Sequence, residues 1–143
     1  MKILLAVDGS KPSLAAAKLV VEHADWLREA PEIDLVTVHL PVPPLGRMGA
    51  AGIHKADIER YYREEGESQL APAKKLLDKS RLSYEAKVLI GPVAETIAKH
   101  AKSSRCDIIC IGTHGRTGIA GAVIGSTASK VLHISDVPVL LAK

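Results

Sequence analysis

Short runs of branched and apolar residues recur along the chain, and most are followed by glycine, proline or aspartate. Runs of this kind predict buried strands that end in turns. In chain order they cover residues 2–7, 33–40, 84–90, 108–111 and 137–142. The third run alternates polar and apolar residues, which is typical of a strand near the edge of a sheet.

Apolar residues at helical spacing fill the intervals between these strands. The first predicted helix has Ser10 as its N-cap and Pro12 at its start, and it extends to about Glu29 before Pro31 ends it. Its expected inward face consists of Leu14, Ala17, Val21, Ala24 and Leu27.

The later helices differ in polarity. A long, charged helix is predicted over 55–80, and two shorter ones follow, with Pro92 in the first turn of one and Ser126 opening the other. The expected inward contacts are Leu70, Ala73, Leu76 and Leu77 in the long helix, and Val93, Ile97 and Ala101 in the next.

Strand and helix therefore alternate over the whole chain, which predicts an α/β fold with a single domain over residues 1–143. Consecutive parallel strands need right-handed helical crossovers, so we expect an open five-stranded parallel sheet with helices on both faces. In such sheets the ligand crevice lies beyond the carboxyl ends of the strands, where the strand order reverses.

A glycine-rich loop joins the fourth strand to the last helix, from Gly112 through Gly115 to Gly125-Ser126. Glycines allow a ligand to approach the backbone closely, and the first turn of a helix presents unpaired N–H groups and a positive dipole end. This order favours a phosphate cradle, although neither a P-loop nor a GxGxxG fingerprint is present, and a surface connection is the alternative.

The longest irregular segment is Pro41–Gly52, which is rich in proline and glycine. Loops of this length are often lids, so we interpret it as a flap near the ligand, with a disordered connector as the alternative. Tyr61 and Tyr62 follow it and are expected to pack beneath the flap in a partly buried structural role.

Composition narrows the function classes. The net charge is +3 with lysine and arginine scattered along the chain, and aromatic residues make up 3% of it, which argues against a nucleic-acid surface. No apolar run approaches the roughly 20 residues that span a bilayer, and no signal-peptide pattern opens the chain, so we expect a cytoplasmic protein with no membrane contact.

Cysteines and histidines form no catalytic pattern. Cys106 and Cys110 are placed on one strand about 13 Å apart, too far for a disulfide, and are expected to be core thiols. His114 in the glycine loop and His39 at a strand end are interpreted as packing residues. We predict no catalytic residue.

The spacing Gly112, Gly115, Gly125-Ser126 resembles the signature of the universal stress protein family, in its ATP-binding subgroup. The opening residues 3–10, the strand at 35–39 and the closing residues 137–141 agree, so the likeness covers essentially the whole chain. It implies the strand order 3-2-1-4-5, which is adenine nucleotide α-hydrolase-like and places the first and fourth strands side by side.

The resemblance implies an ATP site with magnesium accompanying the nucleotide. Asp8 would bind a ribose hydroxyl or reach the magnesium through water, with a turn-forming role as the alternative, and Arg116 would contact the γ-phosphate or remain solvated. The base and ribose would lie against Ala6, Val7, Asp8 and Leu40, and the phosphates against Gly112, Thr113, Gly115, Arg116, Gly125, Ser126, Thr127 and Ala128.

The function implied is a nucleotide-dependent regulatory module in a stress response. The alternatives are a slow ATPase or autophosphorylating protein, and a nucleotide-free dimer that binds a partner. The closing strand over Val137–Ala142 is apolar and last in the sheet, and in the family two such strands pair, so we expect a homodimer. Pro138 suits an edge strand because it lacks the N–H donor.

Overall fold

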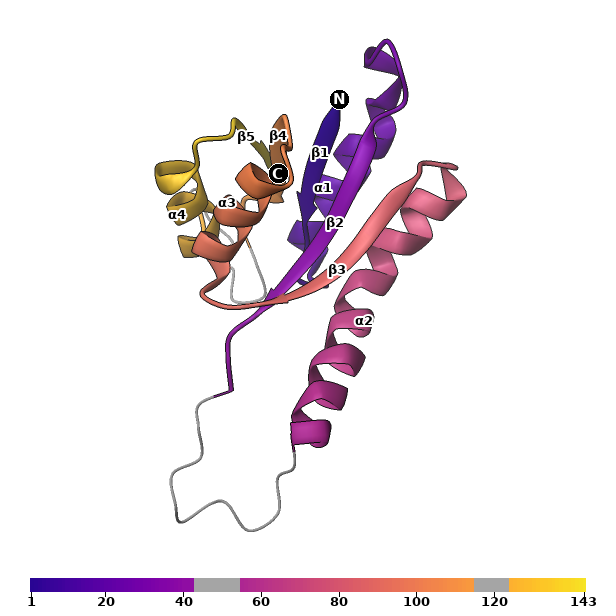
Figure 1. Cartoon of the computed structure of the whole chain (residues 1–143). Helices are drawn as coiled ribbons and strands as arrows, with labels where there is room; N and C mark the ends of the chain where they lie inside the picture. Colours follow the sequence, from indigo (N-terminus) through magenta and orange to yellow (C-terminus); the bar gives the residue numbers. More distant parts are fainter. Residues whose placement is uncertain (43–54, 115–123) are drawn as a thin grey trace.

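The computed structural model describes residues 1–42, 55–114 and 124–143. Five parallel strands form one sheet in the order β3-β2-β1-β4-β5, which confirms the predicted fold (Figure 1). The strands are β1 (Lys2–Ala6), β2 (Glu32–His39), β3 (Tyr84–Ile90), β4 (Ile108–Gly112) and β5 (Val139–Ala142). The helices are α1 (Lys11–Glu22), α2 (Lys55–Lys79), α3 (Val93–Ser103) and α4 (Ser126–Ile134), with a 3-10 turn, η1 (Ala24–Trp26).

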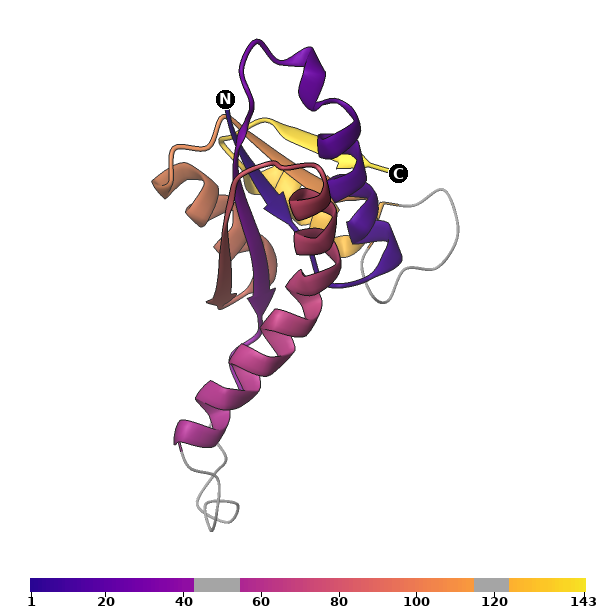
Figure 2. The same cartoon turned by 90° about the vertical axis from the view of Figure 1, so that its right-hand side faces the viewer.

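Two apolar clusters hold the helices on opposite faces of the sheet (Figures 1 and 2). Alternate residues of β1 enter different clusters: Leu5 packs with α1 and α2, whereas Leu4 packs with α3 and α4. Both leucines are fully buried. The central strand thus has no polar face, as expected of a parallel sheet covered on both sides.

The first helix ends earlier than predicted. Ser10 is the N-cap, and its hydroxyl oxygen accepts the Ser13 N–H at 3.2 Å, but α1 stops at Glu22 instead of about Glu29. The 3-10 turn η1 follows, with Trp26 80% exposed. After this turn Leu27 packs, partly buried, against the same apolar cluster as α1, and the chain continues to β2.

The long helix α2 lies close to β3. A Cβ on Gly66 would lie 2.4 Å from Cγ2 of Val88, so the absence of a side chain allows this approach. The first turns of α2 project beyond the sheet (Figure 2). Within the described part of the chain, no helix combines the length and apolarity needed to cross a membrane.

A buried charge network joins β2, β3 and α3, and the sequence analysis did not anticipate it. Asp34 is 1% exposed, and its two carboxylate oxygens contact Lys87 Nζ at 3.2 Å and His100 Nε2 at 2.9 Å. Hydrogen bonds to Glu85 and to Asp34 raise the pKa of Lys87 above its ordinary value. Asp34 therefore remains buried because other elements supply its partners.

The two cysteines are free and buried, but they are not on one strand as predicted. Cys106 precedes β4 and belongs to the cluster beneath α3 and α4, whereas Cys110 lies within β4 and belongs to the cluster beneath α1 and α2. Burial raises the pKa of Cys110 to about 12 and also raises the pKa of Cys106. Both are thus core thiols that stay protonated at neutral pH.

Replacing Asp34 by alanine should destabilise the fold by about 3–5 kcal/mol, because Lys87 and His100 would lose the carboxylate that compensates them. Urea unfolding followed by circular dichroism measures the change. Asp136→Ala is the matched control, since Asp136 pairs with Lys102 while both side chains are more than 70% exposed, and it should change little. Equal unfolding midpoints for the two variants would contradict the assigned role of the network.

Stability should also fall as the pH rises from about 9 to 12. The Cys110 thiol ionises from about pH 9 in the unfolded chain but only near pH 12 in the folded one, so the folded state binds more protons in this window. The loss is up to about 1.4 kcal/mol per pH unit. Urea unfolding of the wild type and of Cys110→Ala across this range isolates the effect, because the variant should show a shallower decline. Parallel curves would contradict it.

Candidate functional site

A cavity of about 820 Å³ lies at the carboxyl ends of the central strands, within the size range of small-molecule sites. It is bordered by the residues after β1, β2 and β4 and by the first turn of α4. All the predicted site residues that the structure describes line it: Ala6, Val7, Asp8, Leu40, Gly112, Thr113, Gly125, Ser126, Thr127 and Ala128. Gly115 and Arg116 lie outside the described residues.

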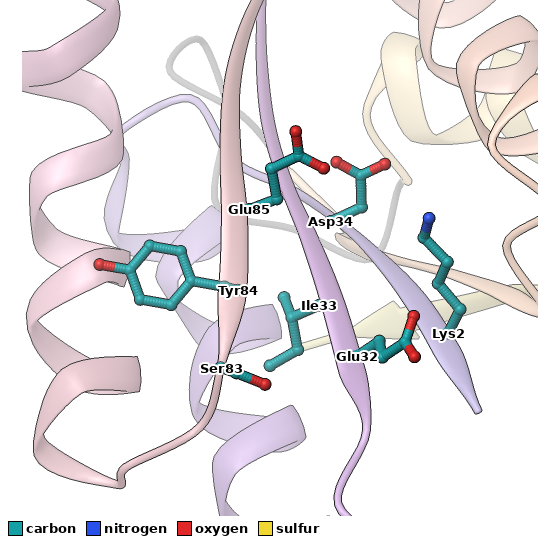
Figure 3. A pocket seen from close by; sticks show the side chains of 7 residues that line it. All are labelled: Lys2, Glu32, Ile33, Asp34, Ser83, Tyr84 and Glu85. Atoms are coloured by element: carbon teal, nitrogen blue, oxygen red, sulfur yellow. The ribbon is translucent and has the colours of Figure 1, made fainter.

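A smaller cavity of about 210 Å³ lies at the opposite, amino-terminal ends of β1, β2 and β3 (Figure 3). The side chains of Lys2, Asp34 and Glu85 stand on neighbouring strands there. Two of the carboxylates in this wall already have partners, since Asp34 contacts Lys87 and His100, and Glu85 contacts Lys87. The larger cavity is therefore the candidate functional site.

Asp8 forms the turn after β1 and lines the larger cavity. One of its carboxylate oxygens accepts the Ser10 N–H at 3.0 Å, and its own N–H donates to Ser13 Oγ at 3.3 Å. Gly9 follows at φ +78°, a conformation that favours glycine. The turn-forming and cavity-lining roles of Asp8 thus occur together, because the turn holds the side chain at the cavity.

Gly112, at the end of β4, is required for packing. A Cβ at this position would lie 2.5 Å from the Pro12 carbonyl oxygen and 3.0 Å from Ser13 Cα, both in the first turn of α1. Only glycine lets α1 approach β4 so closely. The packing brings the turn at Asp8 and the residues directly after β4, Thr113 and His114, to the same cavity.

The start of α4 lies at the cavity. The Thr113 N–H donates to Ala142 O at 2.8 Å, and the Gly125 N–H donates to Thr113 O at 2.7 Å, so both are used within the fold. Gly125 is the N-cap and has no side chain to cap the helix. The amides of Ser126, Thr127 and Ala128 form the first turn, where helix geometry provides no intrahelical acceptor.

Two histidines also line the cavity. The ring of His39, the last residue of β2, lies 5.9 Å from the ring of Tyr62, and His39 is buried. His114 Nδ1 and the Thr113 hydroxyl oxygen are 3.1 Å apart, and His114 Nε2 is buried with no hydrogen-bond partner among the residues described. The interpretation of both residues as packing groups stays a prediction.

The structure adds cavity residues that the sequence analysis did not assign to a ligand. Gln69 of α2 reaches the cavity and accepts a hydrogen bond from the buried Thr37 hydroxyl at 2.6 Å. The sequence signal for Gln69 was its place on the inward face of the long charged helix, four residues before Ala73. The other additions are Ser13, Val36, Val38, Pro41, Val42, Tyr61, Val93, Ile97, Ile111 and Ile124. Beyond Pro41 and Val42, the predicted flap lies outside the described residues.

The cavity has two chemically different parts. Val36, Val38, Val93 and Ile97 provide an apolar wall between β2 and α3, whereas the first turn of α4 provides polar groups. The positive end of the α4 dipole adds to the field at the polar part. This arrangement suits a ligand with an apolar ring system at one end and an anionic group at the other.

Comparison with known proteins identifies similar sequences and structures. The sequence pattern of the Universal stress protein family matches residues 1–143. Universal stress protein MJ0531 of Methanocaldococcus jannaschii is 30% identical over 143 residues, covering 99% of this chain and 81% of that relative. The structure of hypothetical protein MJ0577, from the same organism, superposes with a TM-score of 0.79 at 27% identity, over 99% of this chain and 94% of that one.

Three further solved structures share the fold and are described as nucleotide complexes. A universal stress protein from Archaeoglobus fulgidus with dAMP has a TM-score of 0.65 at 24% identity, covering 100% of this chain and 98% of that one. A universal stress protein family protein from Arabidopsis thaliana with AMP bound has a TM-score of 0.69 at 15% identity, covering 100% of this chain and 91% of that one. A universal stress protein in complex with cAMP has a TM-score of 0.70 at 19% identity, covering 100% of this chain and 97% of that one. The family pattern over the full length, together with these likenesses, shows that the chain belongs to the universal stress protein family.

Proposed function

We propose that the larger cavity binds ATP with magnesium and that the protein acts as a nucleotide-dependent regulatory module in a stress response. The main support is that one cavity contains both an apolar wall and the first turn of α4, which has no side-chain cap. The relatives with AMP, dAMP and cAMP support an adenine nucleotide. The spacing of glycines 112, 115 and 125 resembles the signature of the family's ATP-binding subgroup, and this resemblance favours the triphosphate.

The phosphates are assigned to the start of α4. Amides of Ser126, Thr127 and Ala128 donate to phosphate oxygens, and the hydroxyls of Ser126 and Thr127 add further donors. Hydrogen bonds to a charged acceptor are worth about 1.5–3 kcal/mol, more than neutral ones. Gly125 allows the phosphates to approach the backbone closely, because it places no side chain at the helix start.

The adenosine is assigned to the ends of β1 and β2. Leu40 is 66% exposed and lies at the mouth of the cavity, where a base would cover it, and Val38 and Ile97 line the interior. Asp8 contributes a carboxylate beside Ala6 and Val7. This group either accepts a hydrogen bond from a ribose hydroxyl or holds magnesium through water. Gly115 and Arg116 complete the proposed phosphate side.

We also propose that the protein forms a homodimer through the outer edge of β5. This strand pairs only with β4 among the described strands, and Leu140 within it is 38% exposed. An apolar strand at the edge of a sheet readily accepts another strand. A second copy related by a two-fold axis would extend the sheet and cover this side chain.

Ser126→Pro should weaken ATP binding by about ten- to hundredfold, because it removes one amide donor to the phosphates. The substitution suits the fold, since proline is accepted at the first helical position and Gly125 has ψ 154°, a conformation favoured before proline. Calorimetric titration of nucleotide-free protein with ATP and magnesium measures the affinity.

Ser126→Ala is the matched control, because it removes the hydroxyl but keeps the amide, and it should lose less affinity. Equal affinities of the two variants would contradict the amide contact. Absence of ATP binding by the wild-type protein would overturn the proposed function itself.

Leu140→Lys should convert the dimer into a monomer without unfolding it, because a charge on the outer strand opposes pairing and the side chain is partly exposed. Sedimentation equilibrium gives the mass. Ile90→Lys is the control: Ile90 is 51% exposed on β3, at the other edge of the sheet, and this variant should remain dimeric. A monomeric wild type, or a Leu140→Lys dimer, would contradict the interface.

A further inference from the structure

The hydroxyl of Tyr62 bridges two backbone groups at the mouth of the larger cavity. Tyr62 lies in α2 and is 9% exposed. The Val42 N–H donates to Tyr62 Oη at 2.6 Å, and the Tyr62 hydroxyl donates to Leu40 O at 3.3 Å. Leu40 and Val42 both line the cavity, whereas Tyr62 stands behind them.

These backbone groups lie just beyond the sheet. The Gly91 N–H donates to His39 O at 2.9 Å, and β2 ends at His39. Backbone groups beyond that point need partners other than a neighbouring strand. The phenol satisfies one donor and one acceptor, and its ring also packs against His39 at 5.9 Å between centroids.

The position of Tyr62 is itself set by close packing. Gly66 lies one helical turn further along the same face of α2, directly against the Val88 side chain of β3. A buried phenol held in this way forms a rigid support. The contacts of its ring and hydroxyl extend over three of the four residues from 39 to 42, all of which line the cavity.

We propose that Tyr62 is a positioning residue for the base side of the cavity: its hydroxyl holds residues 40–42 so that Leu40 covers the base of the bound nucleotide. This inference rests on the nucleotide binding proposed above. A phenylalanine in its place keeps the ring contacts but leaves the Val42 N–H and the Leu40 carbonyl to water. Residues 40–42 then adopt the competent arrangement for a smaller fraction of the time, and the apparent affinity falls in proportion.

Tyr62→Phe should therefore weaken ATP binding about tenfold, the scale of one to two hydrogen bonds. Binding of inorganic tripolyphosphate, which has no base, should change less than about twofold, because the phosphate contacts are assigned to the start of α4, whereas the Tyr62 hydroxyl holds residues 40–42. Calorimetric titration of both ligands into wild-type and variant protein, with magnesium present, gives the two ratios.

Tyr84→Phe is the matched control. It removes a tyrosine hydroxyl that donates to Asp78 at 3.0 Å, at the far end of α2, and it should leave the affinity for both ligands unchanged. Unchanged ATP affinity in Tyr62→Phe would overturn the proposal. An equal loss for ATP and tripolyphosphate would also overturn it, because the hydroxyl would then act on the fold as a whole.

Amide hydrogen exchange provides a readout that does not depend on nucleotide. The Val42 amide should exchange about tenfold faster in Tyr62→Phe than in the wild type, whereas the amides of β1 should be unaffected. Absence of ATP binding by the wild type would contradict the proposed function but would not affect this exchange measurement. Equal exchange of Val42 in both proteins would overturn the positioning role separately.

Discussion

The structure depends on the position of β1, which pairs in parallel with β2 on one side and with β4 on the other. Parallel pairing brings the carboxyl ends of all the strands to one edge of the sheet. Right-handed crossovers then place α1 and α2 on one face and α3 and α4 on the other, and the strand order reverses between β1 and β4. The segments after these two strands diverge, and the candidate site lies between them.

Close backbone packing turns this topology into a cavity with defined walls. Gly112 allows α1 to lie directly on β4, and Gly66 allows α2 to lie directly on β3. The first contact places the end of β4 beside the first turn of α1, whose Ser13 bonds the Asp8 N–H. The second places Tyr62 behind the chain that leaves β2. Both glycines therefore act on the site through the helices that they allow to approach.

Some polar groups of the protein are paired within the fold, whereas others can bind a ligand. Asp34 is fully buried near the amino-terminal edge, where Lys87 and His100 satisfy it. At the carboxyl edge the Thr113 and Gly125 amides are used by the fold, whereas the following amides at the start of α4 are left by helix geometry without intrahelical acceptors. An anion gains the most binding free energy from N–H groups that are not already hydrogen-bonded within the protein. For this reason the proposed phosphate site lies at the start of α4.

The sequence by itself determined the strands and the α/β fold, because apolar runs, helix caps and turn residues are local patterns, whereas the strand order and most of the residues assigned to the carboxyl edge came from the resemblance to the family. Tertiary structure decided where α1 ends: the chain leaves the helix at Glu22, and in the 3-10 turn that follows Trp26 is 80% exposed while the next residue, Leu27, packs against the core. It also paired Asp34 with Lys87 and His100, which are 53 and 66 positions away. Contacts over such separations depend on how strands and helices pack, and no local pattern encodes them; Gln69 of α2 reaches the cavity in the same way.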